Sequence, residues 1–435
     1  MKNYLKRLFR FGVITSIILT FLMIGAARAS AQIVVPPGFS VQAVASGANL
    51  DIEPGQGGAF GMDVYYINEA ASPNNIMRVD PAGGPPTIFA SVPSAITLGF
   101  GFGGDLFAAE GASGAVSGNL WRIAFDGSVI FFASIPTFVE GIAFSSGGPF
   151  GTNLYVSEFG PDTIKAVDAF GATTILTGPG TIGTTPTGLE FGPGGAFGSD
   201  LYVIDRSGTI YTVTPAGVSS LFAGIDFGPL INRAETLAFG RSTTLFGENL
   251  FVAEEGTPGR ILKISPDGVL TTFASGFPGF NTSGVTGLEF SKDGNTLFVT
   301  DDQTATLYAI TGGPIEVDID IKPGSAPNSI NLCSGGAVPV AILGSDTFDV
   351  SEVNTGTLRF SGAVVKMVGK KDPHSLCSYE DVNDDFIDDL VCHYVTTDIA
   401  AIDGESYSAT VNGELLDGTP IEGTDSVNIV KDTCN

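Results

Sequence analysis

Short apolar runs separated by turn residues fill most of the chain. The pattern is clearest at residues 187–223, TGLEFGPGGAFGSDLYVIDRSGTIYTVTPAGVSSLFA. Its segments 188–191, 201–204, 209–213 and 218–222 are rich in β-branched or aromatic residues and are bounded by Gly, Pro or Asp, which is typical of strands. Four strands joined by tight turns predict one antiparallel sheet. Because a lone sheet cannot bury its apolar faces, we expect neighbouring sheets to stack on it.

The Leu-Tyr-Val run of this stretch recurs along the chain. At intervals of 42, 48, 47, 49 and 47 residues, its first position is occupied by Val64, Leu106, Leu154, Leu201, Leu250 and Leu297. A four-strand unit at this period is the signature of a β-propeller blade. Asp-Gly and Ala-Gly pairs mark hairpin turns between the third and fourth strands. The sequence predicts six blades, since a seventh would need about 40 further residues.

The last unit lacks its fourth strand, because residues 306–310 run directly into Gly312-Gly313-Pro314. The missing piece stands at the start of the chain, where residues 38–46 resemble residues 268–275. We therefore expect residues 39–46 to complete the sixth blade and leave no open sheet edge there. The predicted propeller covers residues 32–314.

Beyond Ile315 the composition changes. Residues 315–435 contain less glycine and carry 21 acidic against 6 basic side chains. Alternating apolar runs at 316–321, 337–343, 363–368, 390–396 and 407–411 predict a β-sandwich. The predicted fold class is therefore all-β, with a six-bladed β-propeller followed by a small β-sandwich domain.

The first 31 residues have a basic start, a short apolar run and small residues at a cleavage site, which predicts a secretory signal peptide. The alternative is an uncleaved anchor, although the run at 11–24 is short for a bilayer span of roughly 20 residues. No later stretch is long and apolar enough to cross a membrane. We expect an extracytoplasmic monomer, either periplasmic or secreted from the cell.

Removal of residues 1–31 takes away five basic residues and no acidic ones, which leaves a net charge of −31. This charge argues against nucleic acid and anionic lipid as partners, because phosphate recognition needs a basic patch. It suits an exported protein that binds cations, with a plain solvated acidic surface as the alternative.

Every cysteine and histidine lies in the tail. An even number of cysteines in an exported chain predicts two disulfides, with three connectivities open, among Cys333, Cys377, Cys392 and Cys434. The two histidines are His374 and His393, so residues 32–313 contain neither Cys nor His. The propeller therefore lacks the side chains that most often act as nucleophile or general base.

Residues 381–389, DVNDDFIDD, have the spacing of a calcium loop. Oxygen side chains at positions 1, 3, 5 and 9, with a backbone carbonyl at 7, suit Ca²⁺. The predicted ligands are Asp381, Asn383, Asp385, the carbonyl of Ile387, and Asp389. The loop resembles those of dockerin and integrin-type repeats, but Phe386 replaces their Gly at a left-handed turn and Cys392 replaces a bidentate Glu. The alternative is a solvated acidic turn. Cys377 and Cys392 flank the loop and are placed to join its two strands.

An acidic or amide side chain also ends each Leu-Tyr-Val strand. In the usual propeller topology these positions share one rim with the starts of the inner strands, which gives the set Asn68, Glu110, Glu140, Glu158, Asp205, Glu235, Glu254 and Asp301. One interpretation is that each accepts backbone N–H groups at its own turn. The other is a ligand site, with a second divalent cation in the propeller channel.

The segment VPPGFSVQAVASG (35–47) and the FGxDLYV cassettes resemble the NHL, gluconolactonase (regucalcin, SMP-30) and scytonemin-cluster groups of secreted six-bladed propellers. In gluconolactonase-like members, Glu, Asn and Asp just before the Gly-Leu of the inner strands hold a catalytic divalent metal. The matching positions here are Ala48, Ile96, Glu140, Thr187, Glu235 and Thr286, of which only the two glutamates are good ligands. Streptogramin lyase, paraoxonase and quinone-dependent sugar dehydrogenase propellers are similar too, and they rely on a His that this propeller lacks.

The tail resembles a β-domain found at the ends of exported bacterial and archaeal proteins, through residues 319–331, 338–343, 380–391 and 420–427. This resemblance implies an accessory module without enzymatic activity. Two function classes follow. One is an exported binding or cell-envelope protein that recognises a small molecule, glycan or protein, with a calcium-stiffened tail. The alternative is a metal-dependent, gluconolactonase-like hydrolase or lyase acting on a lactone or sugar-like substrate. The missing His and Cys favour the first.

Overall fold

In the computed structural model, the described residues are 32–431 except 112–117, 226–233, 257, 280–285, 346–347, 401–407 and 417–418. The expected signal peptide and Cys434 lie outside this part of the chain. Almost every element is a strand, and the described helices are short 3-10 turns. None of the helices in the described ranges has the length and apolar character needed to cross a bilayer.

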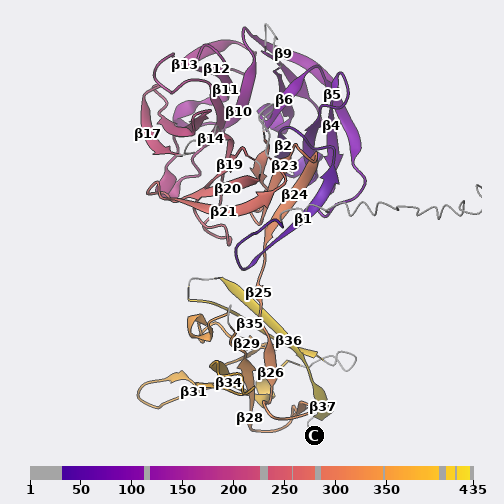
Figure 1. Ribbon diagram of the computed structural model, residues 1–435, viewed down its shortest axis with the longest axis vertical. Coiled ribbons are helices and arrows are strands. Elements are labelled where there is room, and N and C mark those ends of the chain that lie inside the picture. Colours follow the sequence, from indigo (N-terminus) through magenta and orange to yellow (C-terminus); the bar gives the residue numbers. More distant parts are fainter. Residues whose placement is uncertain are drawn as a thin grey trace, which may run out of the picture.

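Six four-stranded antiparallel sheets stand in a ring around a common axis (Figure 1). Each is one blade, and its strands follow one another from the channel outward. Blade 1 contains β2 (Ile52–Pro54), β3 (Val64–Asn68), β4 (Asn74–Val79) and β5 (Thr87–Val92). Blade 2 contains β6 (Ala95–Phe100), β7 (Leu106–Glu110), β8 (Gly118–Ile123) and β9 (Val129–Ile135). Blade 3 contains β10 (Val139–Ser146), β11 (Thr152–Glu158), β12 (Thr163–Val167) and β13 (Thr173–Thr177).

The second half of the ring repeats this order. Blade 4 contains β14 (Pro186–Phe191), β15 (Leu201–Asp205), β16 (Thr209–Val213) and β17 (Ser219–Gly224). Blade 5 contains β18 (Ala234–Phe239), β19 (Leu250–Glu254), β20 (Gly259–Ile264) and β21 (Leu270–Phe277). Blade 6 contains β22 (Leu288–Phe290), β23 (Thr296–Asp301), β24 (Thr306–Gly312) and, from the start of the chain, β1 (Phe39–Ser46).

The strand β1 closes the ring in the place expected from the repeats. It pairs antiparallel with β24, from Phe39 opposite Gly312 to Ser46 opposite Thr306. Val44 is buried against Phe298 and Leu307 of the same blade, and this cluster continues into blade 1. The first and last segments of the propeller are therefore held together by both backbone hydrogen bonds and apolar packing.

Apolar side chains fill each of the six junctions between neighbouring blades. The first residue of every Leu-Tyr-Val run is completely buried, and burial of one such side chain contributes roughly 1.5–3 kcal/mol. In three blades the following tyrosine also donates a hydrogen bond to the carbonyl of a phenylalanine in the preceding 3-10 turn, as Tyr155 does to Phe150 at 2.6 Å. This packing fixes the inner strands, and so the walls of the channel.

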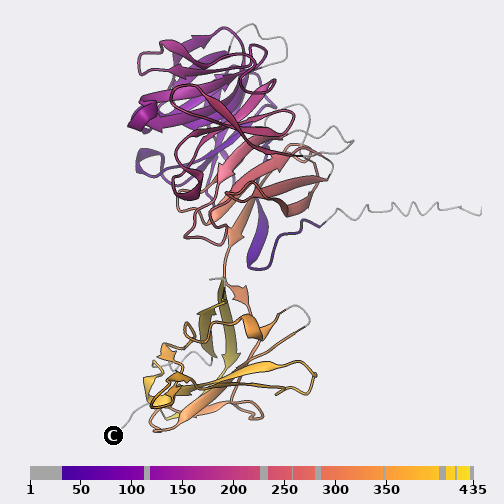
Figure 2. The same cartoon turned by 90° about the vertical axis from the view of Figure 1, so that its left-hand side faces the viewer.

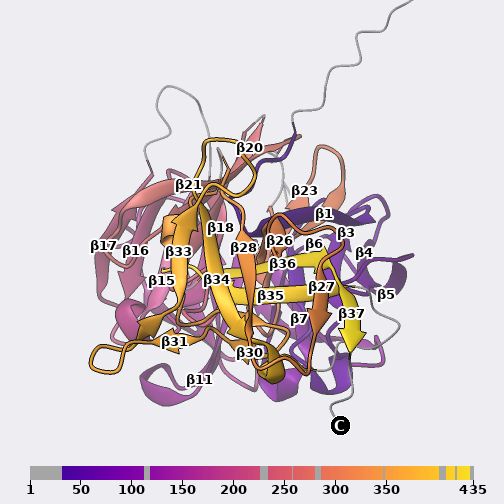
Figure 3. The same cartoon turned by 90° about the horizontal axis from the view of Figure 1, so that it is seen from below.

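The C-terminal domain follows after Gly313-Pro314 and lies below the propeller in the side view (Figure 2). One sheet has the order β25-β36-β35-β29-β30 and the other the order β26-β28-β34-β33 (Figure 3). Their strands are β25 (Ile315–Glu316), β26 (Ile319–Ile321), β28 (Ala337–Ile342), β29 (Arg359–Phe360), β30 (Ala363–Val364), β33 (Cys377–Glu380), β34 (Asp389–Val395), β35 (Ser408–Glu414) and β36 (Pro420–Ser426). Two small ribbons pair β27 (Ser329–Asn331) with β37 (Asn428–Lys431) and β31 (Met367–Val368) with β32 (His374–Ser375).

The two larger sheets share one apolar core, which makes the domain a β-sandwich. The core includes Val340 and Tyr394 from one sheet and Phe360 and Val411 from the other. Cys377 and Cys392 form a disulfide between the adjacent strands β33 and β34. Cys333 is also disulfide-bonded.

Candidate functional site

A cavity of about 280 Å³ lies in the propeller channel, where the inner strands of the blades face one another. The pairing of inner and second strands places equivalent residues of the six blades at one level. Opposite the second residue of each Leu-Tyr-Val run stand Glu53, Gly99, Ala143, Glu190, Ala238 and Glu289. Blades 1, 4 and 6 therefore contribute a glutamate at the same depth, and the other three contribute small residues that leave room between them.

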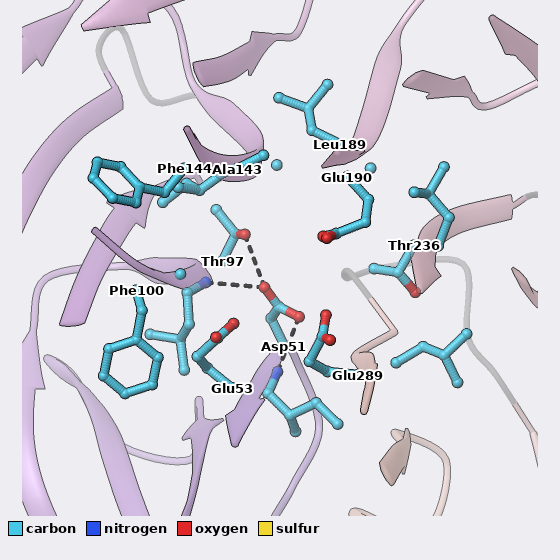
Figure 4. A pocket seen from close by; sticks show the side chains of 18 of the residues that line it. Asp51, Glu53, Thr97, Phe100, Ala143, Phe144, Leu189, Glu190, Thr236 and Glu289 are labelled. Carbon is cyan, nitrogen blue, oxygen red and sulfur yellow. Dashed lines mark hydrogen bonds between the residues drawn. The ribbon is translucent and has the colours of Figure 1, made fainter. Parts of the chain in front are cut away.

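The carboxylates of Glu53, Glu190 and Glu289 converge on the cavity together with that of Asp51, just before β2 (Figure 4). Glu140 of β10 also lines it. Among the described residues that line this cavity, none is basic, and the remaining polar side chains are those of Gln56, Thr97 and Thr236. Every charged side chain in the described lining of the cavity is therefore acidic.

Asp51 is firmly positioned by donors from blades 1 and 2. One of its oxygens accepts the backbone N–H of Ile52 at 2.9 Å. The other accepts the Thr97 hydroxyl at 2.8 Å and the Leu98 N–H at 2.9 Å (Figure 4). Burial nevertheless outweighs these hydrogen bonds, which favour the charged form, and raises the pKa of Asp51 to about 6.

Glu53, Glu190 and Glu289 accept fewer hydrogen bonds than Asp51 does, and their pKa values are raised further. Burial raises the pKa of Glu190 to about 8. The hydrogen bond from the Phe191 backbone N–H favours the charged form, but its effect is smaller. Burial, followed by the charges of Asp51 and Glu190, raises the pKa of Glu53 well above its ordinary value. Burial also raises the pKa of Glu289, to which the Glu190 and Glu53 charges add, although Glu289 accepts the Phe290 N–H at 3.0 Å.

The shifts decide what the cavity can do near neutral pH. Because like charges share one enclosed space, the four carboxyl groups cannot all ionise, and together they retain protons that ordinary carboxyl groups would lose. Such a group of acids attracts a cation, which would displace the protons, and it also offers a proton donor or acceptor in the neutral range.

Six of the eight predicted rim residues end the second strand of a blade, and the aspartates and the asparagine among them accept backbone N–H groups. Asp205 accepts the N–H groups of Ser207 and Thr209, both at 2.9 Å. Asp301 accepts the N–H of Gly279 at 2.9 Å and that of Thr304 at 2.9 Å. Asn68 accepts the N–H of Ala70 at 2.9 Å.

The three glutamates that end second strands, Glu110, Glu158 and Glu254, accept side-chain donors instead. Glu110 accepts the Trp121 indole N–H at 2.7 Å and the Asn119 amide at 2.8 Å. Glu158 accepts Lys165 Nζ at 2.8 Å and is also bonded to Thr163. Glu254 makes a bidentate ion pair with Arg260, in which Arg260 Nη2 lies 2.6 Å from Glu254 Oε1. The backbone donors to Asn68 and Asp205 fit the interpretation that such a side chain serves its own turn. The glutamates instead accept hydrogen bonds from side chains on the third strand of their own blades.

The positions matched to gluconolactonase need one correction. The pairing of Ile52 with Tyr66 makes Leu50, not Ala48, the equivalent of Glu140 in blade 1. The match was wrong because β2 is only three residues long and lacks the Gly-Leu signature. Glu140 reaches Arg206 of blade 4, with Oε1 and Nη2 3.3 Å apart. Glu235 lies in β18, and its side chain is outside the described part of the structure.

In the acidic loop 381–389 of the C-terminal domain, side-chain oxygens accept hydrogen bonds from other residues of the same loop. Asp381 accepts the N–H groups of Asp385 at 3.1 Å and Phe386 at 3.0 Å. The Asn383 amide donates to Asp385 at 2.9 Å, and Asp385 accepts the Ile387 N–H at 2.8 Å. Asp389 is fully buried and accepts the N–H groups of Gly344 and Val382 at 2.8 and 2.9 Å.

The oxygen-rich donor set of this loop is the kind that suits Ca²⁺. Across the described ranges of both domains, however, no three Asp, Glu, His or Cys side chains are already gathered tightly enough to hold a bare metal ion. In this arrangement the carboxylates of Asp381 and Asp385 accept backbone N–H groups of the loop itself.

The four carboxylates of the channel, Asp51, Glu53, Glu190 and Glu289, were not among the site residues predicted from the sequence. Glu190 and Glu289 stand in the repeated TGLEF segments, where a charged residue interrupts an otherwise apolar inner strand. That interruption was the available signal, because Ala143 and Ala238 occupy the same position in blades 3 and 5. Asp51 and Glu53 carried no such signal, since the short strand β2 does not resemble the other inner strands.

The six sheets and the channel define a six-bladed β-propeller protein with a C-terminal β-sandwich. No protein-family model and no curated protein sequence matches the chain. Among solved structures, a virginiamycin B lyase from Staphylococcus aureus is 15% identical with a TM-score of 0.44, covering 63% of this chain and 99% of its own. A gluconolactonase from Xanthomonas campestris is 11% identical with a TM-score of 0.44, covering 66% and 99%.

An auxiliary nutrient binding protein from Bacteroides ovatus is 12% identical with a TM-score of 0.49, covering 63% of this chain and 77% of that one. All three are β-propeller proteins. At these identities the similarity concerns the fold alone, and the function has to be argued from the residues of the channel.

Proposed function

We propose that this protein is an exported binding protein whose propeller channel takes a small positively charged ligand, with a hydrated divalent cation as the first candidate. The observation that carries the proposal is the convergence of Asp51, Glu53, Glu190 and Glu289 on one cavity without a basic residue in its described lining. A cation relieves the repulsion among these carboxyl groups and takes the place of the protons they retain.

The size of the cavity favours an ion that keeps part of its water shell. The volume of about 280 Å³ exceeds what a bare ion needs, and the carboxylates come from three separate blades. Mg²⁺ and related ions commonly bind through one or two carboxylates while they keep several waters. The hydroxyls of Thr97 and Thr236 and the amide of Gln56 line the same space and supply polar partners for such waters.

The proposal includes Ca²⁺ binding by the 381–389 loop, which would stiffen the C-terminal domain. The oxygen-rich side chains of Asp381, Asn383, Asp385 and Asp389 support it, as does the left-handed backbone of Asp384 and Phe386, with φ of 64° and 70°. Export is supported by the leader pattern of residues 1–31 and by the Cys377–Cys392 disulfide, since disulfides persist in oxidising compartments.

Calorimetric titration of the full mature chain tests the channel proposal. Asp385→Ala provides a background in which the loop is disabled, so that heat from Mg²⁺, Mn²⁺ or Ca²⁺ reports on the channel. We expect binding to be tighter at pH 8 than at pH 6, because fewer protons must then be displaced. Glu289→Gln in the same background should weaken it at least tenfold. Absence of binding by all three ions, or affinity unaffected by Glu289→Gln, would refute the proposal.

One observation favours a second function, that of a lactonase-like hydrolase. The pKa of Glu190, about 8, lets this side chain exchange a proton near neutral pH, which is what a general acid or base must do. The assay is hydrolysis of aldonolactones and aryl esters by the full chain with each divalent ion. Turnover that depends on the ion and is lost in Glu190→Gln would replace the binding function by an enzymatic one.

A further inference from the structure

A second cavity, of about 650 Å³, opens on the C-terminal domain beside the 381–389 loop. Its lining combines aromatic rings with short polar side chains, namely Phe348, Asp349, Ser351, Tyr379, Phe386 and Asp388. Sites for small polar molecules have this make-up, in which rings provide contact area and a few polar groups fix the orientation. The lining residues all belong to the C-terminal domain, so the cavity lies outside the propeller.

Phe386 is the most unusual residue of this cavity. Its side chain is 96% exposed, and its φ of 70° places a bulky residue in the left-handed region that favours glycine. The backbone is fixed there, because its N–H donates to Asp381 at 3.0 Å. A strained backbone lowers the stability of the fold, and an aromatic ring exposed to water adds no stabilising packing. Residues with both properties are found at functional sites.

Phe170 in blade 3 shows what an ordinary exposed ring looks like. It is 93% exposed, but it stands before Gly171 in a hairpin turn, and the glycine takes the positive φ of 81°. Exposure alone therefore does not distinguish Phe386. The distinction lies in the strained conformation together with the position at a cavity.

Tyr379 supplies a second ring from a rigid element. It is 53% exposed in β33, where it pairs with Leu390 of β34 two residues after the Cys377–Cys392 disulfide. Because both rings are held on fixed backbone, little conformational entropy is lost when a ligand stacks on them.

The polar lining decides among possible occupants. The carboxylates of Asp349 and Asp388 would repel an anionic ligand. Asp349 accepts the Ser351 N–H at 2.9 Å and keeps further acceptor positions, and an apolar peptide would offer no donor to either carboxylate. Both carboxylates and the Ser351 hydroxyl accept hydrogen bonds, and a neutral sugar ring offers hydroxyl donors at its edge and C–H groups on its faces. We propose that this cavity is a glycan-binding site, in which Phe386 and Tyr379 stack on the rings of a neutral polysaccharide.

Affinity electrophoresis of the full mature chain tests this site, with soluble β-glucan, xylan and mannan as probes in Ca²⁺-containing buffer. We expect at least one of these neutral polymers to retard the wild type. Tyr379→Ala should weaken that retardation about tenfold, the loss of one stacking contact. Phe170→Ala, which removes an equally exposed ring elsewhere, should leave it unchanged.

Phe386→Gly separates binding from folding. Glycine accepts the left-handed conformation without strain, so this variant should melt at the same or a higher temperature than the wild type while it loses retardation. The proposal is overturned if no neutral polymer retards the wild type, if only acidic polygalacturonate does, or if Phe386→Gly and Tyr379→Ala bind as the wild type does.

Discussion

Replacement of Glu190 by glutamine probes the electrostatics of the channel directly. The variant keeps the length of the side chain and a hydrogen-bonding end group but removes one ionisable group. Burial raises the pKa of Glu190 from 4.5 to about 8. The folded state therefore binds this proton more tightly than the unfolded state does. The resulting stabilisation is fully present below about pH 4.5 and is lost as the pH rises through about 8.

The magnitude follows from the shift. One pKa unit corresponds to 1.36 kcal/mol, so between pH 4 and pH 7 the wild type loses about 3 kcal/mol from this group, as an upper bound. Glutamine does not titrate and avoids this loss. With roughly 2 °C per kcal/mol for a domain of this size, the wild type should lose about 6 °C relative to Glu190→Gln over this range. The pKa values of Glu53 and Glu289 should fall as well, since the Glu190 charge contributes to both shifts.

The assay is thermal unfolding of both proteins at pH 5, 7 and 8.5 with a chelator present. We expect the two melting temperatures to be close at pH 5 and to diverge as the pH rises, with Glu190→Gln the more stable. Glu69→Gln, on the exposed rim where Glu69 accepts the Asn49 amide, is the control and should follow the wild type. Parallel curves for wild type and Glu190→Gln would show that the channel carboxyl titrates normally, which would refute the reasoning.

Three further predictions concern the other parts of the molecule. Calcium should raise the melting temperature of the C-terminal domain in the full chain by mass action, and Asp385→Ala should abolish the rise; unchanged melting of the wild type in chelator would make the loop a simple acidic turn. Val44→Asp places a charge in the buried face of β1 and should lower the free energy of unfolding by at least about 3 kcal/mol. The control Gln42→Asp changes an exposed residue of the same strand and should have little effect; equal losses in the two variants would contradict closure of the ring by β1. Replacement of Cys377 and Cys392 by serine should cost about 3 kcal/mol, given their separation of 15 residues, and chemical denaturation with no shift in midpoint would contradict a structural disulfide.

The fold was largely accessible from the sequence because its signals are local and repeated. Each blade carries an apolar Leu-Tyr-Val run and a glycine turn at a regular period, and the incomplete last unit indicated that residues 39–46 belong with residues 306–310. The exception is blade 1. Its inner strand β2 has only three residues and ends at Pro54, so periodicity misplaced its start by two positions.

The candidate site was less accessible, since it depends on which blades face one another. The rim acids Asp205 and Asp301 were easy to find because they recur at strand ends, yet their oxygens accept N–H groups from nearby turns. Glu53, Glu190 and Glu289 are far apart in the chain and meet only when the ring closes. Their shared depth in the channel is a property of strand register, which single-sequence patterns do not give.

The position of a bound cation tests the central claim most directly. Crystals of the mature chain grown near pH 8 and soaked in Mn²⁺ should give an anomalous difference peak in the channel, between Glu53, Glu190 and Glu289 and in contact with them directly or through one water. The peak should disappear in Glu289→Gln crystals treated in the same way. A channel without an anomalous peak in the wild type, with Mn²⁺ found only at the 381–389 loop, would contradict the claim that the propeller channel binds a cation.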